Sequence, residues 1–249
     1  MAFEHAVARR SATQVLPATG GFAVLHADFP LSHEHNRLVV TGPAPVDRVF
    51  ADAERILGGA GLAHRRVDID DDAQGAALGT GRLPRGYTHQ VDLWMALDGA
   101  PDREPTTPVE RVRYPALADA VARDWRRELP DASEEAVRQL VERRRATARA
   151  CTMTHHVVRR AGTVVARCDL YRRGATAQVE NVVTEPEWQG RGFARAVVLD
   201  AARAARGRGC TLVFLIADAD DWPQHLYRRC GFQALGRTHA FQRVGAPTG

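Results

Sequence analysis

The residues best placed to do chemistry in this sequence form a glycine-rich turn, Gln189-Gly190-Arg191-Gly192-Phe193-Ala194. An apolar stretch at 179–184 precedes the turn, and an Ala/Val-rich stretch at 194–206 follows it. Main-chain N–H groups at a helix start, with the positive end of the helix dipole behind them, bind phosphate groups. Glycine allows the positive φ and the close backbone approach that such a turn requires. The pattern therefore predicts a strand, a phosphate-binding turn and a helix, which together point to a nucleotide-like cofactor.

The elements that must position this turn read as a complete α/β unit in the C-terminal part of the chain. Leu117, Val121 and Trp125 have helical spacing, and Pro130 ends that helix. Ser133, followed by two glutamates, is typical of a helix N-terminus. Short hairpin turns are expected at 160–162 and 172–174. We expect helices over 116–129, from 133 onward, over 194–206 and over 222–229, and strands over 109–113, 152–159, 163–171, 176–184, 211–217 and 240–244.

The N-terminal part reads as a partial repeat of this pattern. Strands are expected over 21–26, 37–41, 64–69 and 91–96, with a helix over 45–57. In the place of the glycine turn stands Thr41-Gly42-Pro43-Ala44-Pro45. Proline has no N–H to donate, so this turn is expected to be a poor phosphate site.

The glycine turn and a second motif further along the chain together resemble one protein family. The turn is similar to the Gln/Arg-x-x-Gly-x-Gly/Ala signature of the GNAT superfamily of acetyl-CoA-dependent N-acetyltransferases, with Gln189, Gly192 and Ala194 in the signature places. Arg191 is the usual basic residue between them. Further along the chain, residues 226–232 read Leu-Tyr-Arg-Arg-Cys-Gly-Phe and resemble the Leu-Tyr-x-x-x-Gly-Phe ending of the family. The resemblance implies a mixed, mostly antiparallel central sheet flanked by helices, in the α/β (α+β) class.

The resemblance also sets the expected domains. Three prolines between residues 100 and 109 predict a linker, which we place at 99–107. The catalytic N-acetyltransferase domain is expected at 108–245. Residues 20–98 resemble the degenerate half found in tandem two-domain members, and residues 1–19 are expected to be a ragged, partly disordered arm.

Cofactor contacts follow from the resemblance, residue by residue. The N–H groups of the turn are expected to hold the pyrophosphate of acetyl-CoA, and the N–H of Val182 or Val183 to stabilise the oxyanion. The family often has Asn and Ala at the positions of Asp220 and Pro223. Either Asp220 or the next residue can still cap the helix, but an Asn contact to the cofactor is in doubt. The expected cofactor-binding residues are Val182, Val183, Gln189, Gly190, Arg191, Gly192, Phe193, Ala194 and Asp220.

Two residues are expected to carry the proton transfers. Tyr227 matches the tyrosine that protonates the leaving thiolate in the family; its alternative role is packing of the helix against the sheet. Glu180 shares a strand face with Gln178 and Val182, so its carboxylate could deprotonate the acceptor amine directly or through water. The alternative is a solvated or salt-bridged glutamate.

Composition excludes several other classes. The 249 residues carry 34 basic residues, all arginine, and 30 acidic ones, and this mixture argues against a nucleic-acid surface. No apolar stretch is long enough to span a bilayer, and the N-terminus lacks a secretory signal. The four cysteines have no metal or redox spacing, and the acidic run at 68–72 lacks the glycine and glutamate of a calcium loop. No metal is expected.

These observations predict a cytoplasmic N-acetyltransferase, with acetyl-CoA as co-substrate and a small-molecule or peptide amine as acceptor. Direct transfer in a ternary complex is expected, and a homodimer is possible. The alternative is a non-catalytic protein that senses acyl-CoA or binds a partner through the same fold.

Overall fold

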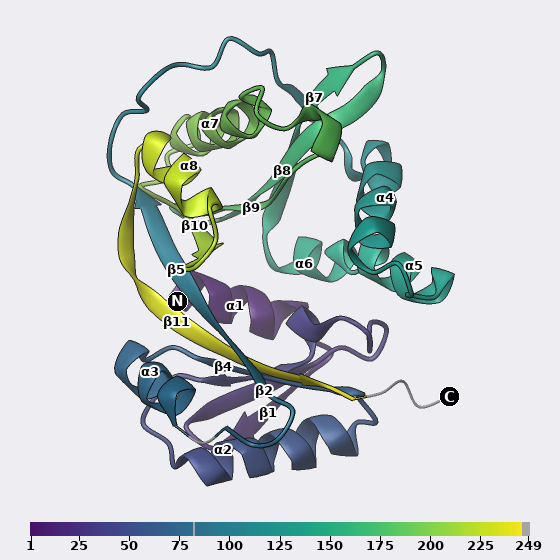
Figure 1. Cartoon of the computed structure of the whole chain (residues 1–249), viewed down its shortest axis with the longest axis vertical. Helices are drawn as coiled ribbons and strands as arrows, with labels where there is room; N and C mark the ends of the chain where they lie inside the picture. The colour runs from purple at the N-terminus through teal and green to yellow at the C-terminus, as the bar shows by residue number, and fades with distance from the viewer. Residues whose placement is uncertain (82, 246–249) are drawn as a thin grey trace. The chain divides into compact units, whose positions relative to one another are not determined.

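The structure is a computed structural model that describes residues 1–81 and 83–245, and it divides into two compact units (Figure 1). The first unit holds Met1–Asp92, Ala132–Ala150 and the described part of Gly236–Gly249. The second holds Leu93–Asp131 and Cys151–Leu235. Each unit is therefore assembled from segments that are far apart in the chain, whereas the expected domains 20–98 and 108–245 follow chain order.

The second unit is built on a mixed sheet with the strand order β5-β10-β9-β8-β7-β6. Four strands pair antiparallel in the order β6-β7-β8-β9, and β10 runs parallel to β9. Gly162 and Gly174 have positive φ values of 80° and 59° and lie in the turns that join β7 to β8 and β8 to β9. The predicted hairpins and the mostly antiparallel sheet are thus confirmed. The strands are the part of β5 (Thr88–Leu97) that begins at residue 93, β6 (Glu110–Val112), β7 (Thr152–Arg160), β8 (Thr163–Arg173), β9 (Thr176–Thr184) and β10 (Leu212–Asp218).

Helices cover this sheet through their apolar faces. Helix α7 (Phe193–Arg206) buries its alanines and valines against β7, β8, β9 and β10, and α8 (Pro223–Arg229) contacts β10 (Figure 1). Burial of these side chains favours the layer by about 25 cal/mol per Å² of apolar surface. Helix α4 (Ala118–Glu128) is joined to β8 by an ion pair between Asp124 and Arg167. Short turns of 3-10 helix lie at η3 (Tyr114–Ala116) and η4 (Pro186–Trp188).

The first unit has a similar plan around the strand order β1-β2-β3-β4-β11. β1 and β2 pair antiparallel, β2 and β3 pair antiparallel, and β3 and β4 run parallel. Strand β4 then pairs antiparallel with the end of β11, from Ile69 opposite His239 to His64 opposite Val244. The elements are β1 (Gln14–Ala18), β2 (Gly21–Leu25), η1 (His33–His35), β3 (Arg37–Val40), α2 (Val46–Ala53), the π-helical η2 (Glu54–Gly58), β4 (His64–Ile69), α3 (Asp72–Thr80) and the part of β11 (Phe232–Val244) that begins at residue 236.

Connectivity in the first unit matches that in the second. β3 leads through a turn and α2 to the parallel strand β4, as β9 leads through a turn and α7 to the parallel strand β10. The turns differ: Pro45 is the N-cap of α2, whereas Gly192 is the N-cap of α7 in a left-handed conformation. Both units therefore contain a parallel strand pair joined by a turn and a helix, while the partial repeat inferred from the sequence stays a prediction.

The N-terminal segment differs from the expectation of a ragged arm. Residues 2–11 form α1 (Ala2–Ser11) and residues 14–18 form β1, so that expectation was wrong. Phe3 is buried, α1 packs against α6 (Arg144–Ala150), and the Arg9 guanidinium lies 3.6 Å from the centroid of the Phe22 ring. Helix α5 (Glu134–Glu142) begins where predicted, and the Ser133 hydroxyl accepts a hydrogen bond from the Ala136 N–H.

Candidate functional site

A cavity of about 760 Å³ lies within the second unit. Its walls come from the end of β9, the glycine turn, the first turn of α7, helix α8, the end of α4 and the segment around residue 102. A volume of this size is in the range of cofactor sites. The lining includes Val182, Val183, Thr184, Gln189, Gly190, Gly192, Phe193, Ala194 and Tyr227.

The glycine turn has the geometry of an anion-binding nest. Gly190 and Gly192 have φ values of 74° and 79°, in the left-handed region that favours glycine. Gly192 is the N-cap of α7, so the N–H groups of the first helical turn have no partner within the helix. Both glycines line the cavity. The phosphate site predicted from the sequence therefore has left-handed glycines, a helix start and an adjoining cavity.

Arg191 is placed differently from the rest of the turn. It is not among the residues that line the cavity. Its guanidinium lies 4.7 Å from the centroid of the Trp188 ring, and Nη2 donates to the carbonyl of Glu187 over 3.2 Å. In this arrangement Arg191 holds the turn against η4.

Strand β9 separates from β10 before it reaches the turn. It pairs with β10 through Thr176, Ala177 and Gln178, and residues 179–184 have no partner on β10 in the described register. The pairing with β8 shifts between Arg167 and Asp169, opposite the left-handed residue Asn181 at φ 52°. Val182 lies within this bulge, Val183 pairs with Arg167 just after it, and both valines line the cavity. The splay and the bulge together direct the end of β9 toward the cavity.

Tyr227 lies on α8, is 8% exposed and lines the same cavity. Burial raises the pKa of the Tyr227 phenol well above its usual range, and the negative charge of Glu180 raises this pKa further. The phenol therefore stays protonated at any physiological pH and can donate a hydrogen bond. A raised pKa also makes full release of the proton more costly, by about 1.4 kcal/mol for each unit that the pKa rises.

Glu180 and Asp220 lie outside the lining of the cavity. Glu180 accepts a hydrogen bond from Nε2 of Gln178 over 2.6 Å and is not among the cavity-lining residues. Its charge nevertheless acts on Tyr227. Asp220 also lies outside the lining, and its N–H donates to the carboxylate of Asp218. Asp221 lines the cavity instead and accepts a hydrogen bond from the Trp222 N–H.

Sequence reasoning missed two parts of the cavity wall. The segment assigned as a linker contributes Asp102 and Arg103, and α4 contributes Asp124, Arg127 and Glu128. Asp102 is ion-paired with Arg195 of α7, and its N–H donates to the carbonyl of Arg229 over 2.9 Å. The spacing of these residues in the sequence did not predict that they would line a cavity. In particular, an aspartate among prolines is typical of a solvated linker.

Neither a metal cluster nor a membrane span is found among the described residues. Across residues 1–81 and 83–245, no group of three or more His, Cys, Asp or Glu side chains is arranged to hold a metal ion. Within the same ranges, no helix combines the length and the apolar character needed to span a bilayer.

Solved structures match this fold over nearly the whole chain. A functionally unknown conserved protein from Staphylococcus epidermidis matches with a TM-score of 0.70 and 13% identity, covering 95% of this chain and 96% of its own. A GCN5-related N-acetyltransferase from Kribbella flavida matches with a TM-score of 0.62 and 16% identity, covering 99% and 96%. At these identities the matches establish the fold alone.

Sequence comparisons identify the family. A glucosamine 6-phosphate N-acetyltransferase from Trypanosoma brucei brucei is 32% identical over 63 residues, which are 25% of this chain and 42% of that relative. The chain thus matches less than half the length of this curated relative. The model of the acetyltransferase (GNAT) family matches residues 114–232, a range that holds the glycine turn, the β9 bulge and Tyr227. Residues 114–232 of this chain therefore belong to the GNAT family of acetyltransferases.

Proposed function

We propose that this protein transfers an acetyl group from acetyl-CoA to a primary amine, with donor and acceptor bound together. One observation carries the proposal: the left-handed glycines of the turn, the splayed end of β9 and the buried phenol of Tyr227 line one cavity. These would serve as a phosphate site, a main-chain hydrogen-bond donor and a proton donor, the three groups that would bind CoA, stabilise the oxyanion and protonate the leaving thiolate.

The residues of the turn fit the cofactor. The N–H groups from Gly190 to Ala194 would hold the pyrophosphate, supported by the dipole of α7. A Cβ added at Gly192 would meet no atom within 4 Å, so its left-handed φ rather than crowding favours glycine here. Acetyl-CoA supplies an activated thioester, and the chain supplies the groups that bind, orient and protonate it.

The main chain of β9 and two side chains would carry the chemistry. The Val182 or Val183 N–H would donate to the acetyl carbonyl oxygen, a contact worth about 3 kcal/mol of barrier when it is preorganised. Tyr227 would donate its O–H to the leaving sulfur. Glu180 would take the proton from the acceptor ammonium through water, since its carboxylate lies outside the cavity lining.

The first unit would not bind a second cofactor. Its corresponding turn, residues 41–45, holds two prolines, and Pro45 is the N-cap of α2. We propose that this unit is a degenerate half that supports the acceptor side of the protein. Titration of the full chain with CoA should then give one site per chain, weakened by Gly192→Val; two sites would overturn this part.

Turnover is tested with acetyl-CoA and a panel of amines. The panel should include polyamines, amino acids, peptide N-termini and glucosamine 6-phosphate, the last suggested by the name of the Trypanosoma relative. Release of CoA can be followed with a thiol reagent at low background, because Cys151, Cys168, Cys210 and Cys230 are all buried. Tight acetyl-CoA binding without turnover of any amine would favour an acyl-CoA sensor instead.

A further inference from the structure

The bulge in β9 is held at a strained residue. Asn181 has φ 52°, and within the described residues it shares positive φ outside glycine with Ala161 alone. A left-handed conformation costs about 1–2 kcal/mol for an ordinary residue and less for asparagine. Ala161 lies in a hairpin turn, where this conformation is common, whereas Asn181 lies inside a strand. The surroundings of Asn181 must therefore hold it there.

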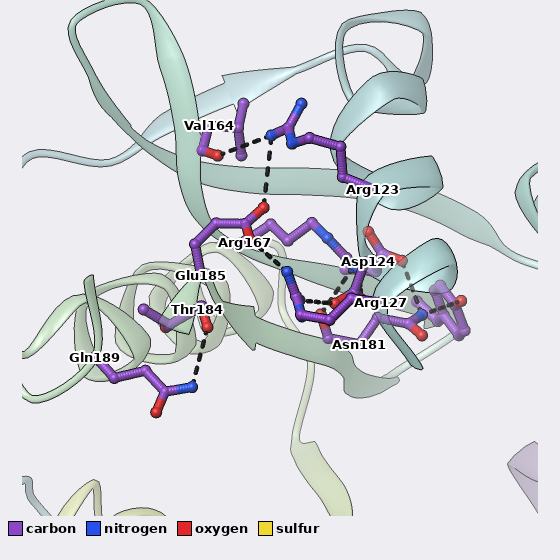
Figure 2. Close-up of polar contacts among 11 residues, drawn as sticks. Arg123, Asp124, Arg127, Val164, Arg167, Asn181, Thr184, Glu185 and Gln189 are labelled. Atoms are coloured by element: carbon purple, nitrogen blue, oxygen red, sulfur yellow. Dashed lines mark hydrogen bonds and ion pairs between the residues drawn. The ribbon is translucent and has the colours of Figure 1, made fainter. Parts of the chain in front are cut away.

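One contact holds the main chain of Asn181. Nη1 of Arg167 on β8 donates to the Asn181 carbonyl oxygen over 3.3 Å (Figure 2). Nη2 of Arg167 donates to Asp124 Oδ2 over 2.5 Å, and Arg127 pairs with the other oxygen of Asp124. Arg167 is 4% exposed and Asp124 is 6% exposed. The carbonyl is thus held by a buried guanidinium whose own position is set by a carboxylate on α4.

A second contact holds the side chain of Asn181. Its amide Nδ2 donates to Asp169 Oδ2 over 2.9 Å and to the Tyr171 hydroxyl over 3.0 Å. Asp169 is fully buried, and its other oxygen lies 2.7 Å from Nδ1 of His155. Both hydrogens of the amide are therefore used, and the side chain is bound to a buried network on β8 and β7.

The consequence concerns the next residue, Val182. The Asn181 carbonyl and the Val182 N–H belong to one planar peptide group, and in a trans peptide they point in opposite directions. A group that holds the oxygen therefore also sets the direction of the N–H. A cationic donor on the carbonyl polarises the peptide and makes its N–H a stronger hydrogen-bond donor.

We propose that Arg167 and Asn181 are positioning residues that aim and polarise the Val182 N–H toward the acetyl carbonyl oxygen of the thioester, with Asp124 and Asp169 holding them. This inference rests on the proposed function and selects Val182, rather than Val183, as the oxyanion donor. A buried ion pair adds little net stability compared with a well-packed apolar pair. The role we assign to the Arg167–Asp124 pair is therefore to hold the peptide group between Asn181 and Val182, and not to stabilise the fold.

The test uses two variants, Arg167→Lys and the double variant Asp124→Asn/Arg167→Met. The double variant removes both buried charges of the pair, so it leaves no unpaired charge and keeps the test available if Arg167→Lys is unstable. Arg123→Met is the matched control. Arg123 is a residue of α4 that pairs with Glu185, and within the described residues it has no hydrogen bond to Asn181. Each protein is titrated with acetyl-CoA and with CoA, which lacks the acetyl carbonyl, and kcat and KM are measured with the best amine.

Both Arg167 variants should lower kcat about tenfold or more, a fraction of the loss expected when an oxyanion donor is deleted. KM for acetyl-CoA should change by less than about threefold, because the contact acts mainly on the transition state. Affinity for CoA should hold, while affinity for acetyl-CoA falls toward that for CoA by no more than the same threefold, and Arg123→Met should change neither affinity. Equal loss of CoA and acetyl-CoA affinity, or an unchanged kcat and preference for acetyl-CoA over CoA, would overturn the proposal.

The two proposals fail in different ways. If the wild-type chain turns over no amine, the proposed function fails, whereas the preference for acetyl-CoA over CoA still reports whether Arg167 directs the N–H. The backbone amide resonance of Val182, compared with and without acetyl-CoA, gives a readout independent of turnover. Its shift on binding should shrink in Arg167→Lys and persist in Arg123→Met; the same shift in both variants would count against the inference.

Discussion

Replacement of Tyr227 by phenylalanine tests the proton donor with little disturbance of packing. The residue is 8% exposed, and its ring meets Phe232 edge to face, with centroids 6.4 Å apart. Phenylalanine keeps these contacts and removes the hydroxyl alone. We expect kcat to fall about 100-fold or more, the usual effect of losing a general acid, while KM for acetyl-CoA stays within about twofold.

Burial of the phenol refines this prediction. Because burial raises the pKa of Tyr227, the wild-type enzyme should show no alkaline loss of kcat from this group up to its ordinary pKa of about 10. The free energy of unfolding depends on pH in the same direction. The phenol of the unfolded chain ionises at a lower pH than that of the folded chain, so this free energy is highest below about pH 10 and falls as pH rises further. Thermal unfolding of the variant at about pH 7.5 should therefore lie close to that of the wild type.

The assay is CoA release under saturating amine, recorded from about pH 6 to about pH 10 for both proteins. A kcat within about threefold of wild type across this range would remove Tyr227 from the mechanism. A parallel fall in acetyl-CoA affinity would instead assign the tyrosine to binding. Tyr87→Phe serves as the control, since Tyr87 is also a tyrosine whose pKa burial raises, to about 12, but it lies in the first unit.

Further predictions concern the turn, the base, the bulge and the first unit. Gly192→Val should weaken CoA binding at least about tenfold by calorimetry, because a β-branched residue disfavours φ near 79°; unchanged affinity would exclude the nest. Glu180→Gln should remove the acidic limb of the kcat/KM profile, and an identical profile would exclude this base. Asn181→Gly should retain several-fold more kcat than Asn181→Ala, because glycine accepts the left-handed φ at little cost; equal losses would contradict strain as the cause. Burial lowers the pKa of His35 to about 4, so the unfolded chain binds more protons between about pH 6.5 and 4; urea unfolding should show stability falling as pH drops through that window, less steeply in His35→Gln.

The sequence predicted most elements of the second unit because their signals are local. The hairpin strands β7, β8 and β9 carry turn glycines between them, and α7 follows a glycine turn with a run of small apolar residues. The glycine turn and Tyr227 could be singled out for the same reason, since a motif of a few residues marks each, and both line the cavity. Both predicted valines also line the cavity.

Other parts of the site depend on contacts distant in sequence. The bulge at Asn181 needs Arg167 and Asp169 from a neighbouring strand and Asp124 from α4, and no spacing rule connects these positions. Strand β11 was predicted as 240–244 but extends over Phe232–Val244, because its exposed first half lacks an apolar alternation. The segment 1–19 was misread because α1 is polar and short, and tertiary packing of Phe3 outweighs its weak helical signal.

The pairing of β4 with β11 has a consequence for synthesis of the protein. Residues 64–69 are made early by the ribosome, whereas their partners, residues 239–244, are added much later. The first unit therefore cannot complete its sheet until the second unit has been translated, although most of the first unit has already emerged by then. Pairing across so large a sequence separation is slow, and it leaves β4 as an exposed edge in the nascent chain. Folding of the N-terminal half should thus finish later than that of a chain-ordered domain.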